Sequence, residues 1–328
     1  MEPLFFEPIL KQARWGGRKL GEILGKPIGT AADYAESWEI ADQKSGDSVV
    51  ARGSRKGRRL SELVRHEGAA LLGRHRHVTQ FPLLIKFLDA NDWLSLQVHP
   101  DDLQARSCDS AENGKTEAWV ILQADPDSRI CSGLKAGVTR EQLSSALLNE
   151  RSLEDCLHII PVKTGDCIFV PAQTVHALGP GIVMAEVQQQ SNLTFRLSDW
   201  GRLGTDGKPR ELHVEQSLNC TDFGRGPVDP VVPRSCREGD HLCEELVACE
   251  HFVIRRHSTG DAFSLRSIDS FRILMLLTGE VVLSWSGGES PFVRGQTTLL
   301  PAALGDATVR PGGEIELLDI TLPTSHAG

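Results

Sequence analysis

No apolar run in the 328-residue sequence is long enough to cross a membrane as a helix. The longest runs, such as FPLLIKFL at 81–88 and RILMLL at 272–277, are far shorter than a bilayer requires. The first residues, MEPLFFEPILKQARWGG, have no basic start, no continuous apolar stretch and no small-residue cleavage site, so no secretory signal is visible. These absences predict a cytoplasmic protein with no membrane partner.

Excess positive charge is also missing. The formal net charge is -9, which argues against a nucleic-acid partner, because such proteins need a basic surface to displace counterions from phosphates. The sequence has no G-x-x-x-x-G-K-[ST] loop, so ATP is not expected. No feature of the sequence predicts a protein partner.

The eight cysteines include no Cys-x-x-Cys pair, and their spacing satisfies no tetrahedral zinc pattern. A chain of this length does not need disulfides for stability, so we expect reduced, structural thiols. A thiolate site formed by Cys236, Cys243 and Cys249 is the minor alternative.

Short strands separated by Gly, Pro and Asp turns dominate the sequence. The expected strands are 34–41, 81–89, 94–99, 117–124, 158–162, 167–171, 182–189, 193–198, 252–256, 271–277, 280–285, 297–301 and 314–321. Two segments, 60–72 and 139–150, have apolar residues at helical spacing, and Thr139 with Gln142 forms a capping-box pattern. The sequence therefore predicts a mainly β fold with inserted helices.

An internal repeat makes this prediction more specific. GDCIFVPAQTVHA, which begins at Gly165, aligns without a gap with GQTTLLPAALGDA, which begins at Gly295. The Gly-x-x-x-x-x-Pro element in both copies is characteristic of double-stranded β-helix (jelly-roll) barrels. We therefore expect two tandem barrels, a catalytic metal-binding domain over 1–235 and a second, degenerate barrel over 236–328, with 220–245 as the connection.

The repeat also predicts where chemistry is absent. His176 aligns with Asp306, and Glu117 aligns with Phe271, so the second barrel is predicted to lack metal ligands.

Polar residues at strand ends of the first barrel form a candidate metal site. Gln97 and His99 are two residues apart on an expected strand and point to the same face. Glu117 begins the next strong strand, and His176 follows the Gly–Pro element. Each residue alone has a structural explanation, such as an ion pair between Glu117 and Lys115. Together, two imidazoles, a carboxylate and an amide oxygen form a zinc ligand set that leaves a position for water or substrate.

Four sequence blocks resemble the signature blocks of the type I mannose-6-phosphate isomerases, and more narrowly their short bacterial form: FPLLIKFLDANDWLSLQVHPDD, GKTEAWVIL, GDCIFVPAQTVHALGPG and EVQQQSNLTFRLSDWGR. WGGRKL and ESWEIAD resemble the N-terminal blocks of this family, so the likeness covers roughly residues 1–215. The resemblance implies a cupin-superfamily enzyme that interconverts mannose-6-phosphate and fructose-6-phosphate with one zinc ion per chain.

Carried over by position, the family's zinc ligands fall on Gln97, His99, Glu117 and His176, and its catalytic arginine falls on Arg196. The resemblance also implies pocket-lining roles for Trp15, Ser95, Lys86, Lys115 and Glu186. Ser198 stands where the family commonly has a tyrosine, so a phenol contact from that position is lost.

Aldose–ketose isomerisation removes a carbon-bound proton and forms an enediol, whose oxyanion charge a divalent cation stabilises. We expect burial to lower the pKa of Lys86 and make it the proton shuttle, with Glu186 as the rival. Arg196 supplies a permanent cation, and its alternative role is an ion pair with Asp199. Lys115, Arg14 and Arg202 are the phosphate candidates, in that order.

Two other functions compete with this interpretation. A non-catalytic zinc or sugar-binding barrel would not need the additional residues Lys86, Glu186 and Arg196. A metal-dependent dioxygenase would favour two or three histidines with a carboxylate, and the amide ligand Gln97 favours zinc instead.

Overall fold

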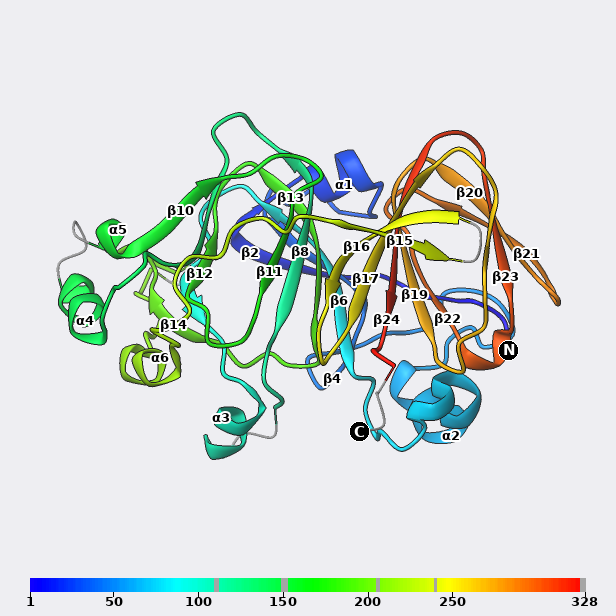
Figure 1. Ribbon diagram of the computed structural model, residues 1–328, viewed down its shortest axis with the longest axis horizontal. Helices are drawn as coiled ribbons and strands as arrows, with labels where there is room; N and C mark the ends of the chain where they lie inside the picture. Colours follow the sequence, from blue (N-terminus) through cyan, green and yellow to red (C-terminus); the bar gives the residue numbers. More distant parts are fainter. Residues whose placement is uncertain (109–111, 149–152, 205–206, 239–240, 325–328) are drawn as a thin grey trace.

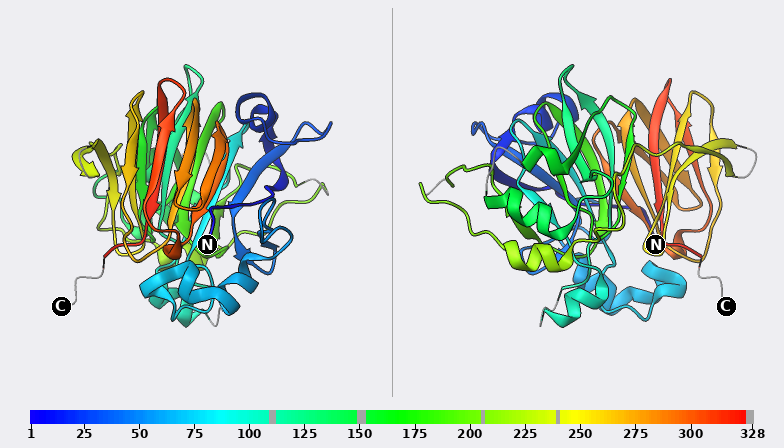
Figure 2. Two further views of the ribbon diagram at one scale, coloured as in Figure 1. Left: turned by 90° about the vertical axis from the view of Figure 1, so that its right-hand side faces the viewer. Right: turned by 60° about the vertical axis from the view of Figure 1, so that its left-hand side comes forward.

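The computed structural model describes residues 1–108, 112–148, 153–204, 207–238 and 241–324. Two β modules lie side by side along the long axis, the first built from the N-terminal two-thirds of the chain and the second from the C-terminal third (Figure 1). Each module contains one large and one smaller antiparallel sheet. Figure 2 shows the strands of the two modules stacked as layers, with the short helices at the periphery.

The first module has a six-stranded and a five-stranded sheet. The six-stranded sheet has the order β11 (Cys167–Val170), β8 (Glu117–Ala124), β13 (Ile182–Gln189), β6 (Leu83–Ala90), β3 (Tyr34–Ile40) and β2 (Ile9–Gly17). The five-stranded sheet has the order β10 (Leu157–Pro161), β9 (Arg129–Leu134), β12 (His176–Leu178), β7 (Leu96–Val98) and β14 (Phe195–Ser198). A two-stranded hairpin, β4 (Asp42–Gln43) and β5 (Gly46–Asp47), follows β3.

The second module has a seven-stranded and a four-stranded sheet. The seven-stranded sheet has the order β1 (Leu4–Phe5), β22 (Thr297–Leu300), β19 (Arg272–Thr278), β24 (Ile315–Thr321), β17 (Val253–Thr259), β16 (His241–Ala248) and β15 (Arg234–Glu238). The four-stranded sheet has the order β18 (Phe263–Leu265), β23 (Ala307–Pro311), β20 (Glu280–Trp285) and β21 (Gly288–Val293). Strand β1 thus joins the start of the chain to the C-terminal module.

Helices cover the edges of this framework: α1 (Lys19–Leu24), α2 (Leu60–Leu72), η1 (Gly73–His75), α3 (Asp102–Ser107), α4 (Arg140–Leu148), α5 (Leu153–Cys156), α6 (Val214–Cys220) and η3 (Ala302–Leu304). The predicted capping box at α4 forms, since the Thr139 and Gln142 side chains each accept the other's backbone N–H. Helices α4, α5 and α6 pack on the outer face of the five-stranded sheet. Within the described ranges, no helix is long and apolar enough to cross a membrane.

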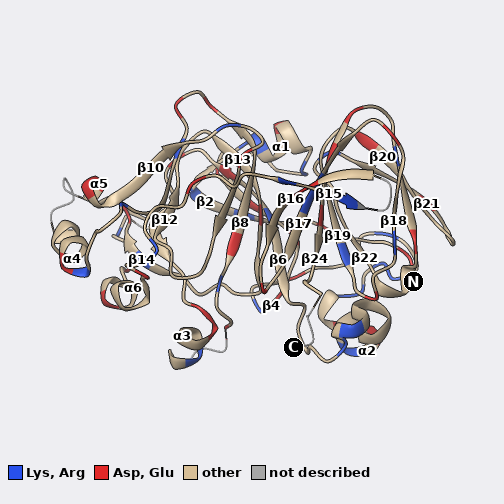
Figure 3. Cartoon of the chain, in the orientation of Figure 1, with Lys and Arg blue, Asp and Glu red and all other residues tan. Residues whose placement is uncertain are grey.

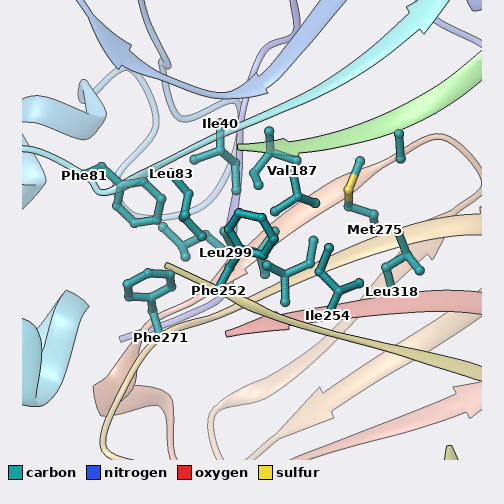
Figure 4. Packing of buried hydrophobic residues seen from close by; sticks show 14 of the residues in the cluster. Ile40, Phe81, Leu83, Val187, Phe252, Ile254, Phe271, Met275, Leu299 and Leu318 are labelled. Atoms are coloured by element: carbon teal, nitrogen blue, oxygen red, sulfur yellow. The ribbon is translucent and has the colours of Figure 1, made fainter. Parts of the chain in front are cut away.

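The largest hydrophobic core lies between the modules (Figure 4). Strand alternation sends Leu83, Ile85 and Phe87 of β6 towards this core, where they meet Ile254 of β17 and Met275 of β19. All five side chains are essentially inaccessible to solvent. The two large sheets therefore stabilise each other, and each leaves its opposite face to line the interior of its own module.

The predicted mainly β fold with inserted helices is confirmed, and β8, β13, β20 and α2 have the predicted bounds. Segment 220–245, expected to be a plain connection, instead includes β15 and the first half of β16, which pair as a hairpin. The expectation that all cysteines are reduced was also wrong: Cys236 lies opposite Cys243 in this hairpin, and the two form a disulfide. The domain boundary at residue 235 stays a prediction.

Candidate functional site

Strand alternation places charged side chains inside the first module. On β6, β8 and β13, the residues next to the core-facing positions are Lys86, Glu117 and Glu186. All three are buried. Because buried charges need partners, their presence on one sheet face indicates a preorganised polar site and not a simple packing core.

The backbone holds the two imidazoles in one tautomer. His99 Nδ1 lies 2.9 Å from the carbonyl oxygen of Leu193, and His176 Nδ1 lies 2.8 Å from that of Thr174. A carbonyl oxygen only accepts hydrogen bonds, so each Nδ1 donates and each Nε2 keeps its lone pair. This is the arrangement in which a histidine binds a metal through Nε2.

The carboxylate of Glu117 lies between the two Nε2 atoms. Its Oε1 is 3.3 Å from His176 Nε2, and its Oε2 is 3.6 Å from His99 Nε2. The indole N–H of Trp119 donates to Oε1 at 3.0 Å and orients the group. One ligand atom from each of His99, Glu117 and His176 lies within 4.8 Å of the others, which is the spacing that a single cation would bridge.

Gln97 completes the set from the neighbouring strand. Strands β7 and β12 pair with Gln97 opposite His176, and the Gln97 amide nitrogen lies 3.2 Å from His176 Nε2. Rotation of the amide about its last bond exchanges oxygen and nitrogen, so the same position presents an oxygen to a cation. The four residues that the sequence singled out as ligands therefore come together.

Lys115 provides a further test of whether a cation fits here. Its Nζ lies 2.7 Å from Glu117 Oε2 and 3.0 Å from His99 Nε2. The Lys115 ammonium thus occupies the place of a metal cation beside two of the candidate ligands, Glu117 and His99. The pair of Lys115 with Glu117, considered from the sequence as a surface contact, is buried. Two imidazoles, a carboxylate and an amide suit a borderline-soft divalent metal.

Burial determines the charge of the candidate ligands. It lowers the pKa of His176 to about 4 and, aided by the positive charge of Lys115, holds the pKa of His99 well below its usual range. Burial also raises the pKa of Glu117 to about 7, against the opposing effect of Lys115. Both imidazoles are therefore neutral near pH 7, as a metal ligand must be.

The expected lowering of the Lys86 pKa was wrong. Its Nζ lies 3.0 Å from Glu186 Oε2 and 3.5 Å from Glu36 Oε2. Burial disfavours the Lys86 ammonium, but these carboxylates outweigh it and raise its pKa above the ordinary value. Burial likewise opposes the charge of Glu186, yet Lys86 and Lys115 hold its pKa at about 2. In the free protein, Lys86 is thus an ammonium and Glu186 a carboxylate.

A pocket of about 380 Å³ opens beside this cluster. Its lining includes all the predicted substrate-binding and catalytic residues, Trp15, Ser95, Lys86, Lys115, Glu186 and Arg196, together with Gln97. Arg196 is half-buried and donates from Nη1 to the Glu211 carbonyl oxygen at 2.7 Å. The alternative partner, Asp199, instead accepts from Arg202 and Arg210.

Sequence reasoning missed the seven other lining residues: Glu36, Trp38, Leu88, Leu94, Asn192, Thr194 and Arg210. Glu36 and Trp38 are two residues apart on β3, so their side chains point to the same face. The spacing of two in ESWEIAD was a signal that both could face the pocket. Arg210 lies outside the strands and has no such signal. Arg14 and Arg202 are absent from the described lining and lie nearby, bound to Asp92.

The second module places different charges at equivalent positions. Val170 pairs with Glu117 in the first module, and Leu300, its counterpart in the repeat, pairs with Arg272. The sequence alignment of Glu117 with Phe271 was therefore one residue out of register. Arg272 forms a buried ion pair with Asp319. A guanidinium thus stands where the first module has the carboxylate of Glu117, and the lack of metal ligands in the second module stays a prediction.

The geometry agrees with comparisons to known proteins. Residues 4–127 match the family model "Phosphomannose isomerase type I, catalytic domain". The chain is 36% identical over 311 residues to mannose-6-phosphate isomerase ManA of Bacillus subtilis, with 93% of this chain and 95% of that protein covered. It is 40% identical over 300 residues to mannose-6-phosphate isomerase of Streptococcus mutans, with 92% of each covered. The crystal structure of the mannose 6-phosphate isomerase from Bacillus subtilis superposes with a TM-score of 0.89 at 30% identity, covering 98% of this chain and 99% of that one.

Proposed function

Because this chain belongs to the type I phosphomannose isomerase family, we propose that it interconverts mannose-6-phosphate and fructose-6-phosphate through an enediol. We further propose one zinc ion per chain, held by Gln97, His99, Glu117 and His176. The convergence of the last three side chains beside a pocket that contains Lys86, Glu186 and Arg196 carries the proposal.

Zinc is proposed from the chemistry of the donors. Glu117 is the one anionic ligand of the four, so a bound divalent ion keeps net positive charge. When bound, the ion supplies Lewis-acid stabilisation of oxyanion charge on the sugar oxygens, an effect of several kcal/mol. The neutral imidazoles and their carbonyl-bound Nδ1 atoms support this assignment.

The proton transfer is assigned to the pair of Lys86 and Glu186. In the free protein the proton of this pair resides on Lys86, because the Glu186 pKa is about 2. Glu186 is therefore the group able to accept the proton from carbon, and Lys86 the group able to return one. This revises the order expected from the sequence, in which Lys86 was preferred as the shuttle.

Arg196 is proposed to face the oxyanion that develops next to the metal. Strand β14 pairs with β7 with Arg196 opposite Gln97, so the guanidinium belongs to the residue beside a proposed ligand. A permanent cation at this place stabilises enediolate charge without any proton transfer of its own. Trp15 and Ser95 line the same pocket and are proposed as substrate contacts.

Metal analysis and a coupled assay test the proposal together. The purified protein should contain about one zinc per chain and produce fructose-6-phosphate from mannose-6-phosphate. Metal-replete protein that turned over no hexose phosphate would eliminate the proposed isomerase function and leave a non-catalytic zinc or sugar-binding protein.

A cytoplasmic location stays a prediction from the sequence. Lys and Arg are interspersed with Asp and Glu over both modules (Figure 3), which argues against a nucleic-acid partner. A small-molecule sugar phosphate is proposed as the partner from the family.

A further inference from the structure

A second pocket, of about 290 Å³, lies at the junction of the two modules, where residues 5–8, the end of α1 and the turn from β21 to β22 meet. Its lining includes Phe5, Phe6, Lys26, Arg52, Arg294 and Thr297. Among the described residues, this pocket and the one beside the proposed metal ligands have no lining residue in common. The junction pocket is therefore a separate site.

We propose that the junction pocket binds a small phosphate monoester with an apolar body, at a site separate from the proposed catalysis. The inference does not depend on the isomerase function, because none of the proposed catalytic residues takes part in it.

Both modules build the walls of the junction pocket, and they meet closely there. Buried Lys26 donates from Nζ to Glu39 Oε1 at 2.6 Å and to the Gly295 carbonyl oxygen at 2.6 Å, so its ammonium bridges the modules. Gly295 has a φ of +77°, and a Cβ at this position would collide with the Leu24 carbonyl oxygen. Helix α1, which ends at Leu24, thus lies against the second module (Figure 1). These contacts hold the walls in place before a ligand binds.

Two arginines of the pocket have no carboxylate partner in the described part of the chain. The guanidinium carbon of Arg52 lies 3.6 Å from the ring centroid of Phe5, and its Nη2 donates to the Pro291 carbonyl oxygen at 3.0 Å. Burial lowers the pKa of Arg52, and no neighbouring carboxylate opposes this effect. Arg294 is exposed, and its side chain makes neither a hydrogen bond nor an ion pair with any described residue. Both guanidinium groups therefore have N–H donors available to a ligand.

The charge of the lining matches a phosphate dianion. Lys26 and Glu39 neutralise each other, which leaves the two positive charges of Arg52 and Arg294. This local excess is notable in a chain whose formal net charge is -9. A phosphate monoester carries about -1.5 to -2 near pH 7, and the planar fork of arginine suits phosphate oxygens.

Thr297 provides an independent observation. It lines the pocket, it is 6% exposed, and its buried Oγ1 has no hydrogen-bond partner within the described ranges. A buried hydroxyl without a partner is costly, so its presence beside a pocket indicates that a bound group accepts its proton. A phosphate oxygen is such an acceptor.

The rest of the lining suits a small organic group. Phe6, Pro8 and Val293 present apolar surface to the same pocket. The volume of about 290 Å³ lies at the lower end of the range for small-molecule sites, about 300–1,000 Å³. The ligand is therefore a small metabolite and not a polymer.

The test is calorimetric titration of the purified protein with phenyl phosphate as the probe, in wild type, R294A and T297V. R294A should weaken binding about 10- to 100-fold, the range for a hydrogen bond to a charged group. T297V should weaken it about 3- to 10-fold, yet unfold without the probe at the wild-type temperature or above, because it removes an unpaired hydroxyl. R310A is the matched control and should bind as wild type, because Arg310 pairs with Glu289 on the exposed surface of the second module.

A crystal soaked with 4-bromophenyl phosphate locates the probe. The anomalous signal of bromine should lie at the junction pocket, beside Phe6 and Val293. The catalytic pocket can also take a phosphate group, so the binding assigned to the junction is the part that R294A weakens and R310A retains.

Equal binding of phenyl phosphate by wild type and R294A would overturn the proposal, as would a bromine signal confined to the catalytic pocket. An equal loss of binding in R310A would also overturn it, because that result identifies general attraction to positive charge. None of these measurements needs turnover, so failure of the proposed isomerase function would leave the test of this site intact.

Discussion

Lys86 and Glu186 lie directly opposite each other on β6 and β13, with Lys86 Nζ 3.0 Å from Glu186 Oε2 and both side chains buried. Burial penalises each ion, and the penalty is offset mainly by the partner, with smaller contributions from Glu36 to Lys86 and from Lys115 to Glu186. The pair therefore fixes which member carries the proton. The same two residues that stabilise the first module through this ion pair are also the ones proposed to transfer the proton.

Lys86→Met should destabilise the protein by about 3–5 kcal/mol at pH 7, because it leaves Glu186 buried without its closest cation. In wild type the Glu186 pKa is about 2, so the stabilisation is present at neutral pH and is lost only as the pH falls towards that value. In the variant, burial raises this pKa, so protonation relieves the penalty as the pH falls. Urea unfolding of both proteins should show a smaller difference at pH 5 than at pH 7.

The double variant Lys86→Met with Glu186→Gln is the control for that prediction. Removing both charges should restore part of the lost stability at pH 7, because neither charge of the buried pair is left without the other. An equal loss of stability at both pH values, or no recovery in the double variant, would contradict this account of the pair.

His176→Ala and Arg196→Ala should separate metal binding from turnover. The first removes a proposed ligand, so zinc content should fall to background and activity with it. The second leaves all four proposed ligands in place, so zinc should stay near one per chain while kcat falls about 100-fold or more. Metal analysis and kinetics on the same preparations provide the measurement. Full activity in Arg196→Ala would refute its catalytic role.

Zinc affinity should depend on pH through Glu117. Its pKa is about 7 without metal, and that of His176 is about 4. A carboxylate ligand must lose its proton, so affinity should fall about tenfold per pH unit below 7 and flatten above it. Competition with a chelator from pH 5.5 to 8.5 measures this. The Glu117→Gln variant should bind zinc more weakly than wild type, and its zinc affinity should no longer depend on pH in this range. Equal zinc affinity of the wild type at pH 6 and pH 8 would exclude Glu117 as the titrating group.

The sequence predicted local features well because they follow from periodicity. The placement of Gln97 and His99 on one face and the apolar stripe of 60–72 depend on residues close in sequence, and the structure has both. The direction of the Lys86 pKa shift could not be predicted in this way, because it depends on Glu186, a hundred positions away in the sequence. Arg210 was missed for a related reason: its place in the pocket depends on its ion pair with Asp199.

The hydrophobic core between the modules leads to a prediction about their independence. Phe252 and Phe271 are fully buried in the cluster where the two large sheets meet, so Phe271→Ala should destabilise the protein by about 3–5 kcal/mol.

Because both modules share this core, the loss should appear in one cooperative transition, with tryptophan fluorescence and circular dichroism coinciding during urea unfolding. A fragment of residues 1–235 would expose one whole face of the six-stranded sheet and should not fold alone. Two separated transitions, or a stable and monomeric 1–235 fragment, would show that the modules are independent domains. In that case the contact between the large sheets would not be required for folding, because the hydrophobic core within each module would be sufficient to stabilise it.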